Sequence, residues 1–241
     1  MSEKNIDSES KKIFEQASQN YKLASLNNAE ILYKKVLKTY PSHVPSLINL
    51  GVVFEKKKNF KASIECYKKA IIENPNNIIA NFNLGSLHNF FGEQDEAIKL
   101  FEKVIKIDPS FIPARKNLGM IYLRNFDLDK SEKYFLDLLK KDRDLTEIQY
   151  MLFFISKIKN IIKLEKSKNF MKAIQESEKL ISSDPAKIEP YLYCLKSLIK
   201  LKKAKTTNHI LKIIKILGAD HIVERFFKEK KINLKFLRIN G

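Results

Sequence analysis

A period of 34 residues constrains this chain more than any other feature of its sequence. The dipeptide Leu-Gly recurs at that spacing, as Leu50-Gly51, Leu84-Gly85 and Leu118-Gly119. Three further kinds of position keep the period: a proline (Pro41, Pro75 and Pro109), a small residue (Ala29, Ser63, Ala97 and Ser131) and an aromatic residue (Tyr33, Tyr67, Phe101 and Phe135). Because unlike positions share one period, we predict a stack of supersecondary units, each burying its apolar face against its neighbours.

Each unit has the apolar pattern of a pair of helices. Phe60, Ile64, Tyr67 and Ile71 recur at the spacing of one helical face. The chain has only six Gly, which argues against an all-β fold with its many turns. The pattern predicts helices over 10–24 and 27–39, 44–57 and 60–73, 78–91 and 94–107, 112–125 and 128–141, 145–167 and 170–182, and 187–202 and 204–217.

These motifs resemble the tetratricopeptide repeat, in which Leu-Gly-x2-Tyr is followed by Ala-x3-Phe and then by Pro. By this register the repeats span 10–43, 44–77, 78–111, 112–145, 154–187 and 188–221, and the first, fifth and sixth depart most from the motif. The resemblance implies an all-α fold, a right-handed α-solenoid of about six helix pairs with a C-terminal capping helix. We expect a disordered tail over 1–9, the solenoid over 10–221, and the capping helix with a basic tail over 222–241.

One position differs from the family's motif, and a second has a structural role within it. No repeat carries the family's Trp, and Leu47, Asn81 and Arg115 stand in its place. The Gly of each Leu-Gly pair falls within a helix, where Gly costs about 1 kcal/mol relative to Ala. The resemblance implies that this small residue lets the two helices of a repeat pack closely. Larger residues at 51, 85 or 119 should therefore destabilise the fold.

The last third of the chain is less regular. The fifth repeat starts at 154, eight residues later than the period requires, which indicates either a longer first helix in that repeat or a misplaced boundary. Ile222, Val223, Phe226 and Phe227 would form one face of the capping helix. In the tail, Lys231–Gly241, apolar residues alternate as in a strand, and both a strand that pairs with a partner and an irregular packed tail remain open.

The sequence offers no catalytic constellation. The four His have no metal-ligand spacing, and there is no Gly-rich phosphate loop. Cys66 and Cys194 are too few for a disulfide framework and are expected to be structural. The start of the chain lacks the apolar core of a secretion signal, and no apolar run is long enough to span a membrane. We expect a cytoplasmic, monomeric protein that is not an enzyme and needs no cofactor or metal.

A periodic amide marks the candidate binding groove. Asn49, Asn83 and Asn117 each precede a Leu-Gly pair. The resemblance implies that the first helices of the repeats line a concave surface, where a ladder of amides would contact the backbone of an extended peptide. The pattern is similar to the asparagine ladder in the repeat arms of O-GlcNAc transferases. Alternatively, each Asn only hydrogen-bonds its neighbours. The predicted groove also includes Ser86, Asn89 and Arg124, and the family's carboxylate clamp for chaperone tails is not predicted.

Positive charge gathers toward the end of the chain. The formal net charge is +17, and residues 188–241 hold 13 Lys and Arg against four Asp and Glu. The candidate basic patch comprises Lys196, Lys200, Lys203, Lys212, Lys215, Arg225, Lys228 and Arg238. Such a patch attracts polyanions, although a solvated basic face has the same composition.

These features predict a non-catalytic scaffold that binds a protein or peptide segment in the groove of its repeats. Two alternatives remain open. One is a basic adaptor for RNA or another polyanion, in which case nucleic acid rather than protein would be the partner, although it is not favoured. The other is a targeting arm of a glycosyltransferase or sulfotransferase system.

Overall fold

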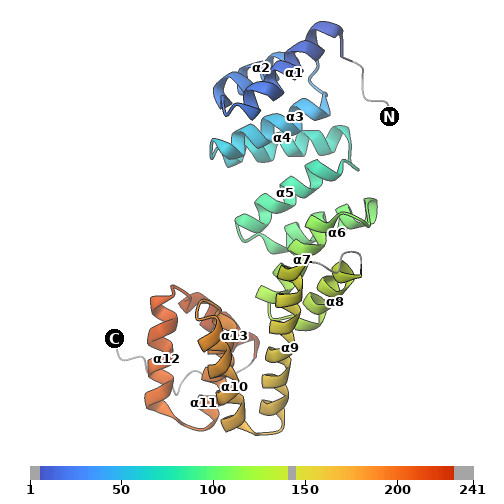
Figure 1. Cartoon of the computed structure of the whole chain (residues 1–241). Helices are drawn as coiled ribbons and strands as arrows, with labels where there is room; N and C mark the ends of the chain where they lie inside the picture. Colours follow the sequence, from blue (N-terminus) through green and yellow to red (C-terminus); the bar gives the residue numbers. More distant parts are fainter. Residues whose placement is uncertain (1–5, 141–144, 231–241) are drawn as a thin grey trace. The chain divides into compact units, whose positions relative to one another are not determined.

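The computed structural model describes residues 6–140 and 145–230, and within these ranges all regular structure is helical (Figure 1). The helices are α1 (Ser8–Lys22), α2 (Leu26–Thr39), α3 (Val44–Lys56), α4 (Phe60–Glu73), α5 (Ile78–Phe90), α6 (Gln94–Ile107), α7 (Ile112–Arg124), α8 (Leu128–Leu139), α9 (Thr146–Lys166), α10 (Phe170–Ser183), α11 (Ile188–Lys200), α12 (Ala204–Ile216) and α13 (Asp220–Glu229). The all-α prediction and the six predicted helix pairs are confirmed. The predicted tail at 1–9 overlaps α1, which begins at Ser8.

The chain divides into two compact units, residues 1–121 and 122–241, and the division falls within α7. In the first unit, helices that follow one another in sequence pack together: α1 on α2, α2 on α3, and so on to α6. This neighbour-on-neighbour packing is the arrangement of an α-solenoid. The periodic aromatic residues Tyr33, Tyr67 and Phe101 are almost completely buried in this unit and form the centre of its core.

The Leu-Gly pairs bring the two helices of a repeat close together. A Cβ on Gly51 of α3 would lie 2.6 Å from Cε1 of Tyr67 on α4, and a Cβ on Gly85 would lie 2.9 Å from Cε1 of Phe101. Real Cβ atoms essentially never approach a neighbour so closely. Because both rings are fully buried, they cannot move aside without disturbing the core. The expectation that larger residues at 51 and 85 do not fit is confirmed.

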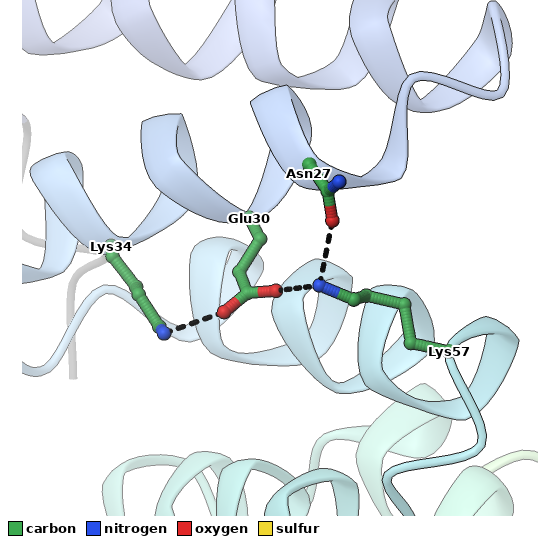
Figure 2. A network of polar contacts seen from close by, with 4 residues as sticks. All are labelled: Asn27, Glu30, Lys34 and Lys57. Atoms are coloured by element: carbon green, nitrogen blue, oxygen red, sulfur yellow. Dashed lines mark hydrogen bonds and ion pairs between the residues drawn. The ribbon is translucent and has the colours of Figure 1, made fainter.

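Polar contacts join one repeat of the first unit to the next. Glu30 of α2 lies between Lys34 on the same helix and Lys57 at the end of α3 (Figure 2). Its carboxylate oxygens are 2.6 Å from Lys34 Nζ and 2.5 Å from Lys57 Nζ, which also donates to Asn27 Oδ1 at 2.8 Å. The two lysines lower the pKa of Glu30, chiefly through their hydrogen bonds.

A left-handed residue recurs at the turn within each pair of helices. Ala24, Lys58, Phe126, Lys168 and Lys202 all have φ between 55° and 60°, and Gly92 has φ of 80°. Only one of these six turns carries the Gly that such a backbone conformation favours. The repeat geometry therefore imposes this conformation whatever residue stands there, which is why the turn position was not recognised from the sequence.

The second unit contains the longest helix, α9, with 21 residues. The surplus of eight residues is thus part of a lengthened first helix in the fifth repeat, which confirms the first of the two interpretations. Near its end, Glu165 is only 7% exposed and accepts hydrogen bonds from Lys196 Nζ at 2.6 Å and Ser197 Oγ at 2.8 Å. These bonds compensate for the burial of the carboxylate and fix α9 to α11.

The capping helix α13 closes the core of the second unit. Phe226 and Phe227 are fully buried. The ring of Phe226 packs edge-to-face on Phe126, with 4.9 Å between centroids, and on Tyr193, with 5.2 Å between centroids. Residues 231–241 lie outside the described residues, and with them both interpretations of the tail. No helix in the described part of the chain combines the length and apolar character that a bilayer crossing requires.

Candidate functional site

The three periodic asparagines occupy the same place on successive first helices of the repeats. Asn49 lies on α3, Asn83 on α5 and Asn117 on α7, and all three side chains are half-buried. Each is followed by the buried Leu of its Leu-Gly pair. Because a helical residue next to a buried one lies at the margin of the packed face, the three amides are placed at the edge of the core.

One of the asparagines, Asn49, contacts the tyrosine of the preceding repeat. Asn49 Nδ2 donates to Tyr33 Oη at 3.2 Å, and the same hydroxyl lies 3.0 Å from Ser18 Oγ. One repeat on, burial and the hydrogen bond that the Tyr67 hydroxyl donates to Glu55 raise the pKa of Tyr67. At the third position the preceding aromatic residue is Phe101, which has no hydroxyl.

The remaining predicted groove residues are less uniform. Ser86 lies one turn after Asn83 on α5, and its hydroxyl donates to the carbonyl of Phe82 at 2.9 Å. Asn89 is half-buried near the end of the same helix. Arg124 belongs to the second unit, where its carbonyl accepts from the guanidinium of Arg225. Desolvation and the nearby charge of Arg225 lower the pKa of Arg124.

The predicted basic patch contains two kinds of residue. Lys196 is paired with the buried carboxylate of Glu165, and Arg225 donates to a backbone carbonyl, so both have roles within the fold. Arg238 lies outside the described residues. The other members are exposed on α11, α12 and α13 or in the turn between α11 and α12: Lys200, Lys203, Lys212, Lys215 and Lys228.

Three of the residues in the place of the family's Trp have a shared role that was not predicted from the sequence, whereas Leu47 has no polar side-chain atom for it. Asn81 Nδ2 donates to the carbonyl of Pro75 at 3.0 Å, and Arg115 Nη2 donates to that of Pro109 at 2.8 Å. In the sixth repeat, Tyr191 Oη donates to the carbonyl of Pro185 at 3.2 Å. Three different side chains thus satisfy the same carbonyl, six residues earlier, at the junction between repeats. The signal available in the sequence was that each is a hydrogen-bond donor.

A cavity of about 590 Å³ in the second unit was also not predicted. We call it the lysine cavity. It is lined by Asn125, Phe126, Asp127, Leu128, Asp129, Lys159, Ile162, Lys163, Lys166, Tyr193 and Lys230. Four of its residues lie on one face of α9. The spacing of Lys159, Lys163 and Lys166 is the signal in the sequence from which this face could have been identified.

The two cysteines are buried, and burial changes the chemistry of their thiols. Burial raises the pKa of the Cys66 thiol to about 11 and that of the Cys194 thiol to about 12, so both are protonated near neutral pH. No group of three or more His, Cys, Asp and Glu in this part of the chain is arranged to hold a metal ion.

Comparison with known proteins supports the repeat assignment. Residues 44–77 and 78–111 each match the tetratricopeptide repeat. Among solved structures, a tetratricopeptide repeat protein from Parabacteroides merdae is 16% identical, with a TM-score of 0.56 and 92% of each chain covered. Pseudomonas aeruginosa pilF is also 16% identical, with a TM-score of 0.55, 91% of this chain and 97% of that chain covered.

A third structure matches only in part. A mutant O-GlcNAc transferase of Thermobaculum terrenum is 17% identical, with a TM-score of 0.51, over 55% of this chain and 26% of the transferase. No curated protein matches the chain in sequence. At these identities the structural matches establish the fold and do not transfer an activity.

Proposed function

We propose that this chain, a helical-repeat protein of the tetratricopeptide family, is a non-catalytic scaffold that binds an extended segment of a protein partner along the first helices of its repeats. The observation that carries the proposal is the periodic placement of Asn49, Asn83 and Asn117 on α3, α5 and α7. A side-chain amide offers both a donor and an acceptor, which suits the backbone of a bound peptide.

The contact of Asn49 with Tyr33 supports an oriented amide at this position of the ladder. Asn49 uses one N–H for Tyr33 Oη. This leaves the second N–H and the carbonyl oxygen of an Asn side chain for a ligand, because the amide has two donors and an acceptor. A hydrogen bond to a buried tyrosine limits rotation of the amide, which reduces the entropy lost when a peptide binds.

The proposal is tested by affinity capture from nuclease-treated lysate of the source cells. We compare the wild type with the triple variant Asn49→Ala, Asn83→Ala, Asn117→Ala. The control replaces Asn28, Asn76 and Asn208, three exposed asparagines outside the first helices, by Ala. Protein partners retained by the wild type and the control, and lost by the ladder variant, are the expected result. Thermal unfolding followed by circular dichroism verifies that each variant is folded.

A further variant separates binding from packing. Tyr33→Phe removes the hydroxyl that Asn49 contacts but keeps the amide itself. We expect Tyr33→Phe to weaken capture less than Asn49→Ala. Equal capture by the wild type and the ladder variant, with the captured material released by nuclease or salt, would contradict the proposal and point to polyanion binding instead.

A further inference from the structure

The lysine cavity combines a cationic rim with an apolar floor. Lys163 and Lys166 lie in the last turn of α9 and Lys230 follows α13, and all three are exposed. Phe126, Leu128, Ile162 and Tyr193 contribute the apolar part of the lining. A volume of about 590 Å³ lies within the range of ligand sites, roughly 300–1,000 Å³.

The charges within the cavity are unevenly satisfied. Lys159 Nζ lies 2.6 Å from both Asp129 Oδ1 and Glu132 Oε2, so this lysine is already paired with two carboxylates. Asp127 accepts from the backbone N–H of Lys130 at 3.1 Å and pairs with its Nζ at 3.2 Å. No described carboxylate forms an ion pair with the remaining three lysines. The cavity therefore presents an excess of positive charge beside an apolar surface.

We propose that the lysine cavity binds an acidic segment of a partner protein. Carboxylates of the segment would pair with Lys163, Lys166 and Lys230, and an apolar side chain between them would pack on Ile162, the half-buried apolar residue of the lining. Charge complementarity carries the choice of ligand, because three lysines that form no ion pair with a described carboxylate line one cavity and are stabilised by added carboxylates.

The floor favours a peptide over a nucleic acid. A base would need an exposed aromatic face on which to stack. Phe126 is only 7% exposed and Tyr193 only 1%, and both rings pack against Phe226. Neither ring can therefore serve as a stacking platform, whereas an aliphatic side chain can pack on the half-buried Ile162.

The test uses fluorescence anisotropy with the full chain and a labelled peptide that alternates Glu and Leu. The variant Lys163→Gln, Lys166→Gln removes two rim charges. Its control is Lys212→Gln, Lys215→Gln, which removes two exposed lysines of the same spacing near the end of α12. We expect the first variant to weaken binding about tenfold and the control to weaken it less than about twofold.

Other outcomes overturn the proposal. The proposal is wrong if the wild type does not bind the peptide, or if the two lysine variants lose the same affinity. It is also wrong if a peptide with Gln in place of Glu binds equally well, or if a single-stranded RNA of the same charge binds more strongly. The variant lacking Asn49, Asn83 and Asn117 should bind the acidic peptide like the wild type. Loss of binding there would place the peptide on the asparagines rather than in the cavity, so the two proposals fail separately.

Amine acetylation followed by mass spectrometry gives an independent measure of the site. Bound peptide should protect Lys163, Lys166 and Lys230 from acetylation and leave Lys212 and Lys215 as reactive as before. Uniform protection of all five lysines would show diffuse attraction and contradict a defined site.

Discussion

At the scale of single residues, Gly51 and Gly85 of the first two Leu-Gly pairs are fixed by close contact with an aromatic ring. In an ordinary helix, replacing Gly by Ala stabilises by about 1 kcal/mol. At Gly51 the new Cβ would meet the buried ring of Tyr67 at 2.6 Å. Overpacking of this kind typically costs about 1–3 kcal/mol, which exceeds the gain in helix propensity.

We therefore predict that Gly51→Ala lowers the free energy of unfolding by up to about 2 kcal/mol, the overpacking cost less the gain in helix propensity. Chemical denaturation of the variant and the wild type measures the difference. Ser86→Ala, at a half-buried position within α5, is the control and should change stability by less than about 1 kcal/mol. A Gly51→Ala variant more stable than the wild type would show that Tyr67 moves aside freely.

The chemistry of the individual residues also determines which contacts could be predicted from the sequence. The periodic Gly, Pro and aromatic positions were informative because each has one physical role in every repeat. Asn81, Arg115 and Tyr191 share a role but not a residue type, so their bonds to the junction carbonyls became visible only in the structure. The tyrosine contact of Asn49 likewise requires two repeats to be placed next to each other.

At the scale of the helices and turns, the left-handed position within each pair is a source of strain. Lys58 has φ of 59° and an exposed side chain, so a Gly there loses no packing. A left-handed non-Gly residue costs about 1–2 kcal/mol, partly offset by the greater freedom of Gly in the unfolded chain.

We expect Lys58→Gly to raise the free energy of unfolding by about 0.5–1 kcal/mol. The matched control is Lys61→Gly, because Lys61 is exposed in the first turn of α4 with ordinary helical geometry. That control should instead destabilise by up to about 1 kcal/mol. Thermal denaturation of both variants provides the measurement, and the same sign for both would contradict the strain argument.

The Glu30 network between α2 and α3 predicts a dependence on pH. The pKa of Glu30 is lowered below 4.5 by Lys34 and Lys57. The folded state therefore holds the carboxylate charged more readily than the unfolded state does. Its contribution to stability is complete above the unfolded pKa and is lost as the pH falls through the folded pKa.

Glu30→Gln should accordingly lower stability by about 0.5–1 kcal/mol at pH 7, and the difference from the wild type should shrink as the pH falls below 4.5. Denaturation curves at a series of pH values measure this difference. Lys57→Gln, which removes a partner of the same carboxylate, should show the same trend. A difference that persists unchanged at pH 3 would show that packing rather than charge is responsible.

At the scale of the whole molecule, the repeat period predicted the helix pairs, including the fifth and sixth, in which the motif is weakest. Periodicity alone did not predict the division into two units within α7 or the lysine cavity. The cavity depends on α9, α11 and the end of α13 converging, and no local pattern encodes such a convergence.

Packing between sequence neighbours predicts how a local defect spreads. Because helices of the first unit pack on those next to them in sequence, the loss of stability in Gly51→Ala should fall with distance along the chain. Hydrogen exchange measured by mass spectrometry should show faster exchange in α3 and α4, a smaller effect in α2 and α5, and none in α11 and α12. Equal acceleration in all helices would show that the chain unfolds as one cooperative body.

The contact between Gly51 and Tyr67 has a consequence for how such a chain lengthens. Both residues lie within 44–77, so tandem duplication of that segment would copy both sides of the packing contact between the two helices. The contact with the preceding segment includes the hydrogen bond between Asn49 and Tyr33 and the ion pair between Lys57 and Glu30. In a tandem duplication of residues 44–77, the copy of Asn49 would follow Tyr67 at the spacing at which Asn49 follows Tyr33. Whole repeats could then be added to the chain without new sequence at the junction between repeats.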